Sequence, residues 1–239
     1  MTVRPFDGWT EIRIDREAQR NALDRRTRLL LREALEAARG ARAVVLTGTG
    51  GSFCAGLDLK ERAAERAAGQ TDTAGEEAIA LNMALREHPA VVIAAVNGLA
   101  YGGGVTLVNS CDLALAASSA TLACPEISFA SYASMAGPTS SLLLTRKRAA
   151  WLLLANERLD AATAERWGLV NEVVAPDSLA ARAAELAQRI AGYDAATLDE
   201  TKQALNRLPA ATGTGAWRAA LEYGQTVNEA IRARKRAAA

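Results

Sequence analysis

Two glycine-rich segments show the strongest sign of chemistry in this sequence. GTGGSFCAG spans residues 48–56 and follows the apolar run AVVLT, whereas GLAYGGG spans residues 98–104 and follows AVVIAAV. Because parallel sheets place ligands beyond the carboxyl ends of their strands, we expect both loops at one edge of a sheet. Each loop can direct one backbone N–H at the same point, and such a pair of donors is an oxyanion hole. Two tight turns would explain the glycine content equally well.

Other chemistries find less support in the residue types. Neither loop has the GxGxxG frame or the Gly-Lys-Ser/Thr ending of a nucleotide-phosphate site. His88 is the one histidine, which excludes a site that needs two, and its place before Pro89 indicates a structural or surface role. No metal is expected, because the sequence has no His/Cys cluster with ligand spacing. Cys54, Cys111 and Cys124 form an odd set without a CxxC motif, which is typical of free thiols in a reducing cytoplasm.

The composition is that of an ordinary globular protein. The chain has 239 residues, of which 50% are hydrophobic and 23% are charged, and its formal net charge is +1. That balance predicts neither a nucleic-acid partner nor binding to a membrane surface. The uncharged run from Pro89 to Cys111 is divided by Asn97 and three glycines, so it indicates buried strands and a core helix rather than a membrane span.

The elements that must position the two loops alternate along the chain. Strands are predicted at residues 9–14, 41–48, 90–98, 111–117, 120–128 and 170–174. Amphipathic helices lie between them, the first in NALDRRTRLLLREALEAAR at residues 21–39, and from residue 178 the pattern is almost entirely helical. This order predicts an α/β fold with parallel strands, divided into a core at residues 1–177 and a helical C-terminal region at residues 178–239.

Six segments add a more specific pattern. They are RNAL (20–23), SFCAGLDLKE (52–61), IAAVNGLAYGGG (93–104), CDLALAA (111–117), ACPEI (123–127) and AERWGLVNEVV (164–174). In this order and at this spacing they closely resemble the crotonase family, the enoyl-CoA hydratase/isomerase superfamily. The resemblance covers residues 9–176 strongly and the rest more loosely. It implies a spiral of ββα repeats and an activity on acyl-CoA thioesters, with coenzyme A as part of the substrate and no separate cofactor.

The resemblance implies that backbone N–H groups do part of the chemistry. Ala55 matches the family's first oxyanion donor, and Gly103 matches the second, at a helix N-terminus whose dipole favours negative charge. Together they would polarise the thioester carbonyl and make an enolate accessible. The residues that match the family's coenzyme A-binding positions are Arg20, Ala22, Ala55, Gly56, Leu57, Asp58, Leu59 and Lys60. For Arg20 and Lys60, a solvated surface charge is the alternative interpretation.

The resemblance also assigns the acid–base chemistry. Hydratases of this family use two glutamates, and the positions that match them here are Thr106 and Glu126. Threonine cannot act as a base at neutral pH. Isomerases of this family use a single glutamate at the second position to move a proton between C2 and C4. The pair Thr106 and Glu126 therefore favours isomerase-type chemistry, with an atypical hydratase and a non-catalytic acyl-CoA-binding protein as the alternatives.

The expected acyl pocket departs from the family pattern after Glu126. The segment SFASYASMAGP keeps Gly137, but Ala130 and Ala133 stand where the family has glycine and proline. An unusual acyl group is therefore expected. The residues expected to line the pocket are Gly102, Thr106, Tyr132, Ser134 and Met135.

The resemblance further implies association between copies of the chain. A homotrimer or a dimer of trimers is expected, with the C-terminal helices packed between subunits. In those helices Trp217, Leu221 and Val227 face either a partner copy or the core of their own chain. The acyl-CoA thioester is the expected small-molecule partner, the expected location is cytoplasmic, and fatty-acid metabolism is the expected setting.

Overall fold

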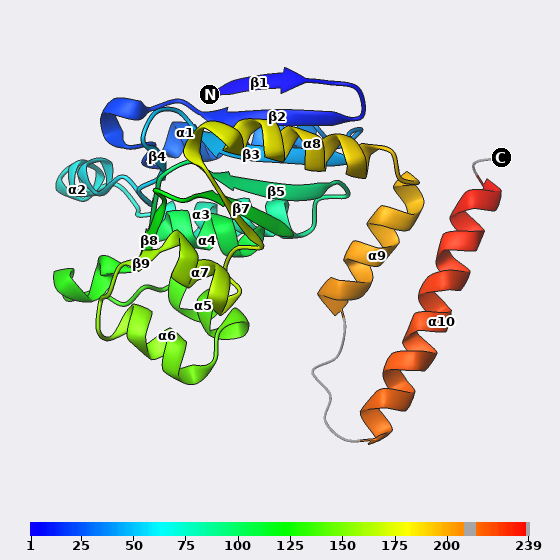
Figure 1. Ribbon diagram of the computed structural model, residues 1–239. Helices are drawn as coiled ribbons and strands as arrows, with labels where there is room; N and C mark the ends of the chain where they lie inside the picture. The colour runs from blue at the N-terminus through cyan, green and yellow to red at the C-terminus, as the bar shows by residue number, and fades with distance from the viewer. Residues whose placement is uncertain (208–213, 238–239) are drawn as a thin grey trace.

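The computed structural model describes residues 1–207 and 214–237, and it shows an α/β protein built on two sheets (Figure 1). The larger sheet has the strand order β1-β2-β3-β5-β7-β10. Its first two strands pair antiparallel and the remaining pairs are parallel. The strands are β1 (Thr2–Pro5), β2 (Trp9–Ile14), β3 (Ala43–Gly48), β5 (Val91–Val96), β7 (Leu113–Ala117) and β10 (Glu172–Val174). The predicted parallel α/β architecture is confirmed.

A smaller sheet forms beside the larger one, where the two glycine-rich loops lie. Its order is β4-β6-β8-β9, and its first three strands pair in parallel. The strands are β4 (Ser52–Cys54), β6 (Leu99–Tyr101), β8 (Thr121–Ala123) and β9 (Leu159–Asp160). The strands β3, β5 and β7 of the larger sheet are each followed along the chain by one strand of the smaller sheet, as the ββα repeat implied by the family resemblance requires.

Helices connect and cover the strands. They are α1 (Arg25–Ala37), α2 (Leu59–Ala67), α3 (Ala74–Arg86), α4 (Gly103–Ser110), α5 (Ala136–Leu143), α6 (Arg146–Leu153), α7 (Ala161–Trp167), α8 (Leu179–Ala191), α9 (Ala195–Arg207) and α10 (Thr214–Ala237). Short 3-10 turns occur at Glu17–Gln19, Pro125–Phe129 and Pro176–Ser178. Helix α1 begins after Asp24, whose carboxylate accepts a hydrogen bond from the N–H of Thr27 at 2.7 Å, and this N-cap places its start four residues after the predicted one.

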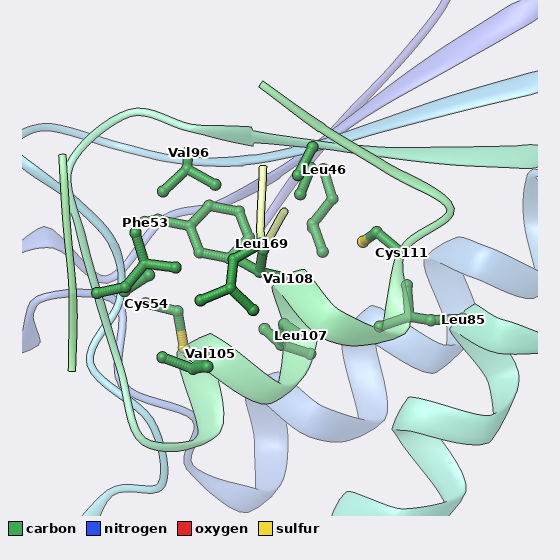
Figure 2. Close-up of a cluster of buried hydrophobic side chains, with 14 of the residues drawn as sticks. Leu46, Phe53, Cys54, Leu85, Val96, Val105, Leu107, Val108, Cys111 and Leu169 are labelled. Atoms are coloured by element: carbon green, nitrogen blue, oxygen red, sulfur yellow. The ribbon is translucent and has the colours of Figure 1, made fainter. Parts of the chain in front are cut away.

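Both faces of the larger sheet are buried, which explains the unbroken apolar runs of its strands. Leu46 of β3 and Val96 of β5 point into the cluster drawn in Figure 2, where they meet Phe53, Leu107 and Leu169. The alternate residues of the same strands point to the opposite face. A strand that is covered on both sides loses the apolar–polar alternation of a half-exposed strand.

Helix α8 covers that opposite face of the sheet. Its residues Leu186 and Ile190 share a hydrophobic cluster with Val45 and Ile93 of the sheet. The expected boundary between residues 177 and 178 therefore separates side chains that pack in one core. The division into a core and a helical region with a role in association stays a prediction.

Helices α9 and α10 lie side by side at the end of the molecule, away from the glycine loops (Figure 1). A buried ion pair fastens α9 to the body: Lys202, 4% exposed, places its Nζ 2.7 Å from Asp112 Oδ2 and 2.9 Å from the carbonyl oxygen of Ala90. Residues 208–213 and 238–239, and the side chains of Trp217 and Leu221, lie outside the description. Of the helices that are described, none is long and apolar enough to cross a membrane.

Candidate active site

The two glycine loops meet because β4 and β6 lie side by side. Cys54 of β4 stands opposite Ala100 of β6 in a parallel pair, so the carboxyl ends of both strands lie at the same edge of the smaller sheet. Gly56 has a φ of +89°, and a Cβ built on it would lie 2.9 Å from both the nitrogen of Gly103 and the carbonyl oxygen of Tyr101. Glycine at position 56 thus allows direct contact between the two backbones.

Two backbone N–H groups stand free at this contact. A Cβ built on Gly103 would lie 3.5 Å from the nitrogen of Leu57, so the two amides are neighbours. Among the residues that the structure describes, none accepts a hydrogen bond from the N–H of Leu57 or of Gly103. Gly103 is also the first residue of α4, where unpaired N–H groups and the helix dipole favour negative charge.

The N–H of Ala55, expected as the first donor, is already engaged. It donates to the carbonyl oxygen of Arg20 at 3.0 Å. Arg20 has a left-handed backbone with φ of 53°, which turns the chain of this loop toward β4. The free N–H in the AGLDL segment is therefore two residues further on, at Leu57. Residue types alone could not have shown this, because side chains do not determine which amide of a tight turn is left unpaired.

Glu126 lies over Gly102 at the same site. It stands in the first turn of the 3-10 segment Pro125–Phe129, and a Cβ added to Gly102 would lie 2.7 Å from its Oε1. Its Oε2 is buried and finds no hydrogen-bond partner among the described residues. Burial raises the pKa of this carboxyl above its ordinary value. A carboxyl in such surroundings is suited to accepting and returning a proton near neutral pH.

Thr106, which the resemblance matches to the first glutamate of hydratases, is completely buried. Its Oγ1 donates a hydrogen bond to the carbonyl oxygen of Gly102 at 3.4 Å, one turn back along α4. The hydroxyl is thus directed to the helix backbone, and it supplies neither an acid nor a base.

A cavity of about 340 Å³ surrounds these groups. Twelve of the residues expected from the sequence line it: Arg20, Ala55, Gly56, Leu57, Leu59, Gly102, Gly103, Thr106, Glu126, Tyr132, Ser134 and Met135. Within the described part of the chain, Glu126 is the one carboxyl in the cavity wall. Free N–H groups and a single desolvated carboxyl thus share one cavity.

Three residues expected to bind coenzyme A lie outside the cavity wall. Asp58 is the N-cap of α2, where it accepts from the N–H groups of Lys60 and Glu61, and it pairs with Arg16 at 3.1 Å. Ala22 is buried, and its carbonyl oxygen accepts a hydrogen bond from Arg16. Lys60 is exposed on α2. Asp58 and Ala22 hold the loop in place through the Arg16 guanidinium.

Several other groups at the site were not predicted from the sequence. Arg16 joins its own loop to Asp58, 42 residues further along the chain, and no local pattern marks it. The cavity wall also contains polar or aromatic side chains that were not predicted from the sequence: Arg62, Asn82, Tyr101 and Phe129. Arg62 and Asn82 come from α2 and α3, which read as ordinary charged and amphipathic helices in the sequence.

His88 has a structural role, in agreement with its interpretation from the sequence. Its ring is buried; Nδ1 accepts from the N–H of Ala90 at 3.1 Å, and Nε2 then donates to the carbonyl oxygen of Leu35 at 2.8 Å. Burial lowers the pKa of the ring, which favours this neutral form. A search of the described residues finds no group of three or more His, Cys, Asp or Glu side chains arranged to hold a metal ion.

Comparison with known proteins defines the class. The profile of the enoyl-CoA hydratase/isomerase family matches residues 7–229. The mevalonyl-coenzyme A hydratase of Aspergillus fumigatus is 35% identical over 207 residues, covering 79% of this chain and 73% of that protein. The crystal structure of an enoyl-CoA hydratase from Bacillus anthracis superposes with a TM-score of 0.86 at 29% identity, covering 96% of this chain and 90% of that one.

A second solved structure agrees with the first. The enoyl-CoA hydratase of Mycobacterium smegmatis superposes with a TM-score of 0.84 at 30% identity, covering 95% of this chain and 88% of that one. The chain belongs to the enoyl-CoA hydratase/isomerase family, also called the crotonase family. It is an enzyme of that family that acts on acyl-CoA, as the resemblance of the six segments implied.

Proposed function

We propose that this protein is an enoyl-CoA isomerase that moves a proton with one glutamate while an oxyanion hole holds the thioester oxygen. The observation that carries the proposal is Glu126, the single carboxyl among the described residues of the cavity wall, which lies against the backbone that supplies the N–H donors. A reaction that shifts a double bond needs one group to take a proton and return it, so one carboxylate suffices.

The N–H groups of Leu57 and Gly103 are the proposed oxyanion donors. They are neighbours and have no acceptor among the described residues, so the carbonyl oxygen of a thioester can receive both hydrogen bonds. Negative charge that develops on this oxygen would be stabilised by donors already in position, and one such donor typically contributes about a hundred- to a thousandfold in turnover. Leu57 takes the place that the sequence assigned to Ala55.

Glu126 is the proposed proton carrier. In its ionised form it would remove a proton from C2 of a 3-enoyl thioester, and the electron pair would spread over the dienolate to the oxygen. The carboxyl would then return the proton at C4, which gives the conjugated 2-enoyl thioester. Atoms and charge balance without a water molecule, and Thr106 is not required.

Coenzyme A enters this proposal as part of the substrate and without a further cofactor. Arg20, which lines the cavity from the loop before α1, is the proposed contact for its phosphates, with Lys60 on the exposed face of α2 as a second contact. Association as a homotrimer or dimer of trimers, a cytoplasmic location and a role in fatty-acid metabolism belong to the same proposal. The location rests on the three free, buried thiols.

An atypical hydratase is the second candidate. It is favoured by the names of similar proteins, which include a mevalonyl-coenzyme A hydratase and an enoyl-CoA hydratase. The replacement of the first glutamate by Thr106 is the observation against efficient hydration, because threonine cannot activate a water molecule as a base.

A panel of CoA esters tests the proposal. The protein is incubated with 3-hexenoyl-CoA and with 2-hexenoyl-CoA, and the products are followed by the ultraviolet absorbance of the conjugated thioester and by mass. We expect the 3-enoyl ester to gain conjugated absorbance at unchanged mass. Faster addition of water to the 2-enoyl ester would support the hydratase, release of free CoA would support a hydrolase, and binding of both esters without any turnover would support a non-catalytic binding protein.

A further inference from the structure

Arg62 forms part of the wall of the cavity. It belongs to the first turns of α2 and lines the cavity beside Leu59 of the same helix and Ala78 and Leu81 of α3. These three neighbours are apolar, as a hydrocarbon chain requires. A guanidinium in the same wall is poorly suited to a hydrocarbon chain, because contact with such a chain would remove water from a permanent charge.

The charge at Arg62 is only partly balanced by the protein. Its Nη2 and the Nη2 of Arg66, the latter at 3.1 Å, share one carboxylate oxygen of Asp72. Within ion-pair distance of either guanidinium, the described residues supply no second carboxylate. Two guanidinium groups thus share one carboxylate, so Arg62 does not have Asp72 to itself.

A donor on Arg62 is also left unused. Its Nε is buried and has no hydrogen-bond partner among the described residues. A buried donor without an acceptor is costly to folding, and the cost is larger for a charged group. Such a group in a native structure calls for an explanation, and the carboxylate of a ligand matches the planar donors of a guanidinium.

We propose that the acyl group carries a free carboxylate that Arg62 binds, so that the substrate is the mono-CoA thioester of a short dicarboxylic acid. This inference rests on the proposed function, because it assumes that the acyl group enters this cavity. The cavity of about 340 Å³ is at the small end of ligand pockets, which agrees with a short acyl group. Arg20 is the other cation in the wall, and it is assigned to the phosphates of coenzyme A.

Binding of unreactive saturated esters tests the proposal apart from catalysis. Dissociation constants are measured by calorimetry for succinyl-, glutaryl- and adipyl-CoA and for their uncharged counterparts butyryl-, valeryl- and hexanoyl-CoA. In the wild-type protein we expect at least one charged ester to bind roughly tenfold or more tightly than its counterpart, in keeping with a hydrogen-bonded ion pair. Arg62→Met is expected to abolish or reverse this preference.

Lys147→Met, at an exposed position of α6, is the control, because it removes one positive charge outside the cavity wall and leaves the ion pairs of Arg62 in place. The preference for the charged ester is expected to persist in this variant. Equal binding of charged and uncharged esters by the wild type would overturn the proposal. An unchanged preference in Arg62→Met would also overturn it, because that result would indicate that Arg20 binds the carboxylate. If no CoA ester binds at all, the proposed function itself fails, whereas esters that bind without preference leave that function intact.

Discussion

Glu126 reaches the reaction site only because residue 102 is glycine. Gly102 has φ of +51°, and an added Cβ would lie 2.7 Å from Glu126 Oε1, well inside van der Waals contact. Backbone conformation and close approach therefore both require glycine at this position. The glycine triplet thus serves two purposes, since Gly102 makes room for the carboxyl and Gly103 presents its N–H.

Gly102→Ala is expected to displace the carboxyl and to lower kcat by about a hundredfold or more, because proton transfer depends on position. Binding of butyryl-CoA is expected to change far less, since the free N–H groups and the rest of the cavity remain. Gly168→Ala is the matched control: it also has positive φ, at +86°, but nothing stands within 4 Å of its added Cβ. An equal loss of kcat in both variants would contradict the account.

The buried carboxyl also predicts a dependence on pH. Because burial raises the pKa of Glu126 in the folded state, folding favours its protonated form, so its stabilising contribution is present at acid pH and is lost as the pH rises through the raised pKa. Glu126→Gln removes that ionisation. The variant should therefore be the more stable protein at neutral pH, with a Tm higher by up to about 2–4 °C, and the difference should shrink toward acid pH.

The pH dependence of kcat should also report Glu126, but turnover requires its ionised form, whereas stability favours its protonated form. The base form is the carboxylate, so kcat is expected to fall as the pH falls through a pKa above the ordinary range of glutamate. Thermal unfolding and kcat measured over the same pH range check both expectations. A Gln variant that is less stable than the wild type at neutral pH would count against the desolvated carboxyl.

At the residue scale, the sequence identified the atoms that side-chain type determines. Glu126 and Thr106 were assigned through the family resemblance of ACPEI and of the helix after the glycine triplet, and the structure places both in the cavity wall. The free amide at Leu57 and the guanidinium of Arg62 did not follow. The first depends on which N–H the carbonyl of Arg20 occupies, and the second on which face α2 presents to the cavity.

At the scale of elements, the pairing of β4 with β6 positions the site. These strands have three residues each, so the alternation that marks a strand is too short to see, and the sequence indicated only loops there. By contrast, β2 was predicted with its observed bounds, because six residues of WTEIRI alternate over a half-buried face. β1 was missed, since its antiparallel edge position leaves it mostly exposed and without a periodic pattern.

A buried ion pair between Lys202 and Asp112 contributes to the attachment of α9. Lys202→Met is expected to destabilise the fold by about 3 kcal/mol, because it leaves Asp112 without its partner in a largely buried setting. Chemical denaturation measures the change. Lys147→Met, at an exposed position of α6, is the control and should change stability by less than about 0.5 kcal/mol; an equally small effect at Lys202 would contradict the anchoring role.

At the scale of the whole molecule, the sheet is covered on both faces, yet α5 and α6 expose large apolar side chains. Leu142 is 85% exposed, Leu154 is 64% exposed and Trp151 is 54% exposed. Exposed apolar side chains of this size on neighbouring helices are typical of a contact surface. From the family resemblance we expect this surface to contact a second and a third copy of the chain. The structure describes a single chain, so this contact stays a prediction.

Light scattering coupled to size exclusion checks this association. The expected mass is three or six times that of one chain, and Leu142→Glu combined with Leu154→Glu is expected to shift it toward one, because a charge cannot be buried cheaply in an apolar contact. A wild-type protein that elutes as a single chain would contradict the prediction. The fold class followed from the sequence, whereas this surface did not, since exposure is a property of the assembled helices.

The division of labour between Glu126 and Thr106 is tested most directly by turnover of 3-hexenoyl-CoA in three proteins: the wild type, Glu126→Gln and Thr106→Val. Binding of hexanoyl-CoA is measured in parallel to separate chemistry from affinity. The account predicts that Glu126→Gln lowers kcat at least about a hundredfold with a nearly unchanged Kd, and that Thr106→Val keeps kcat within about threefold. Full activity in Glu126→Gln, or loss of activity in Thr106→Val, would contradict it.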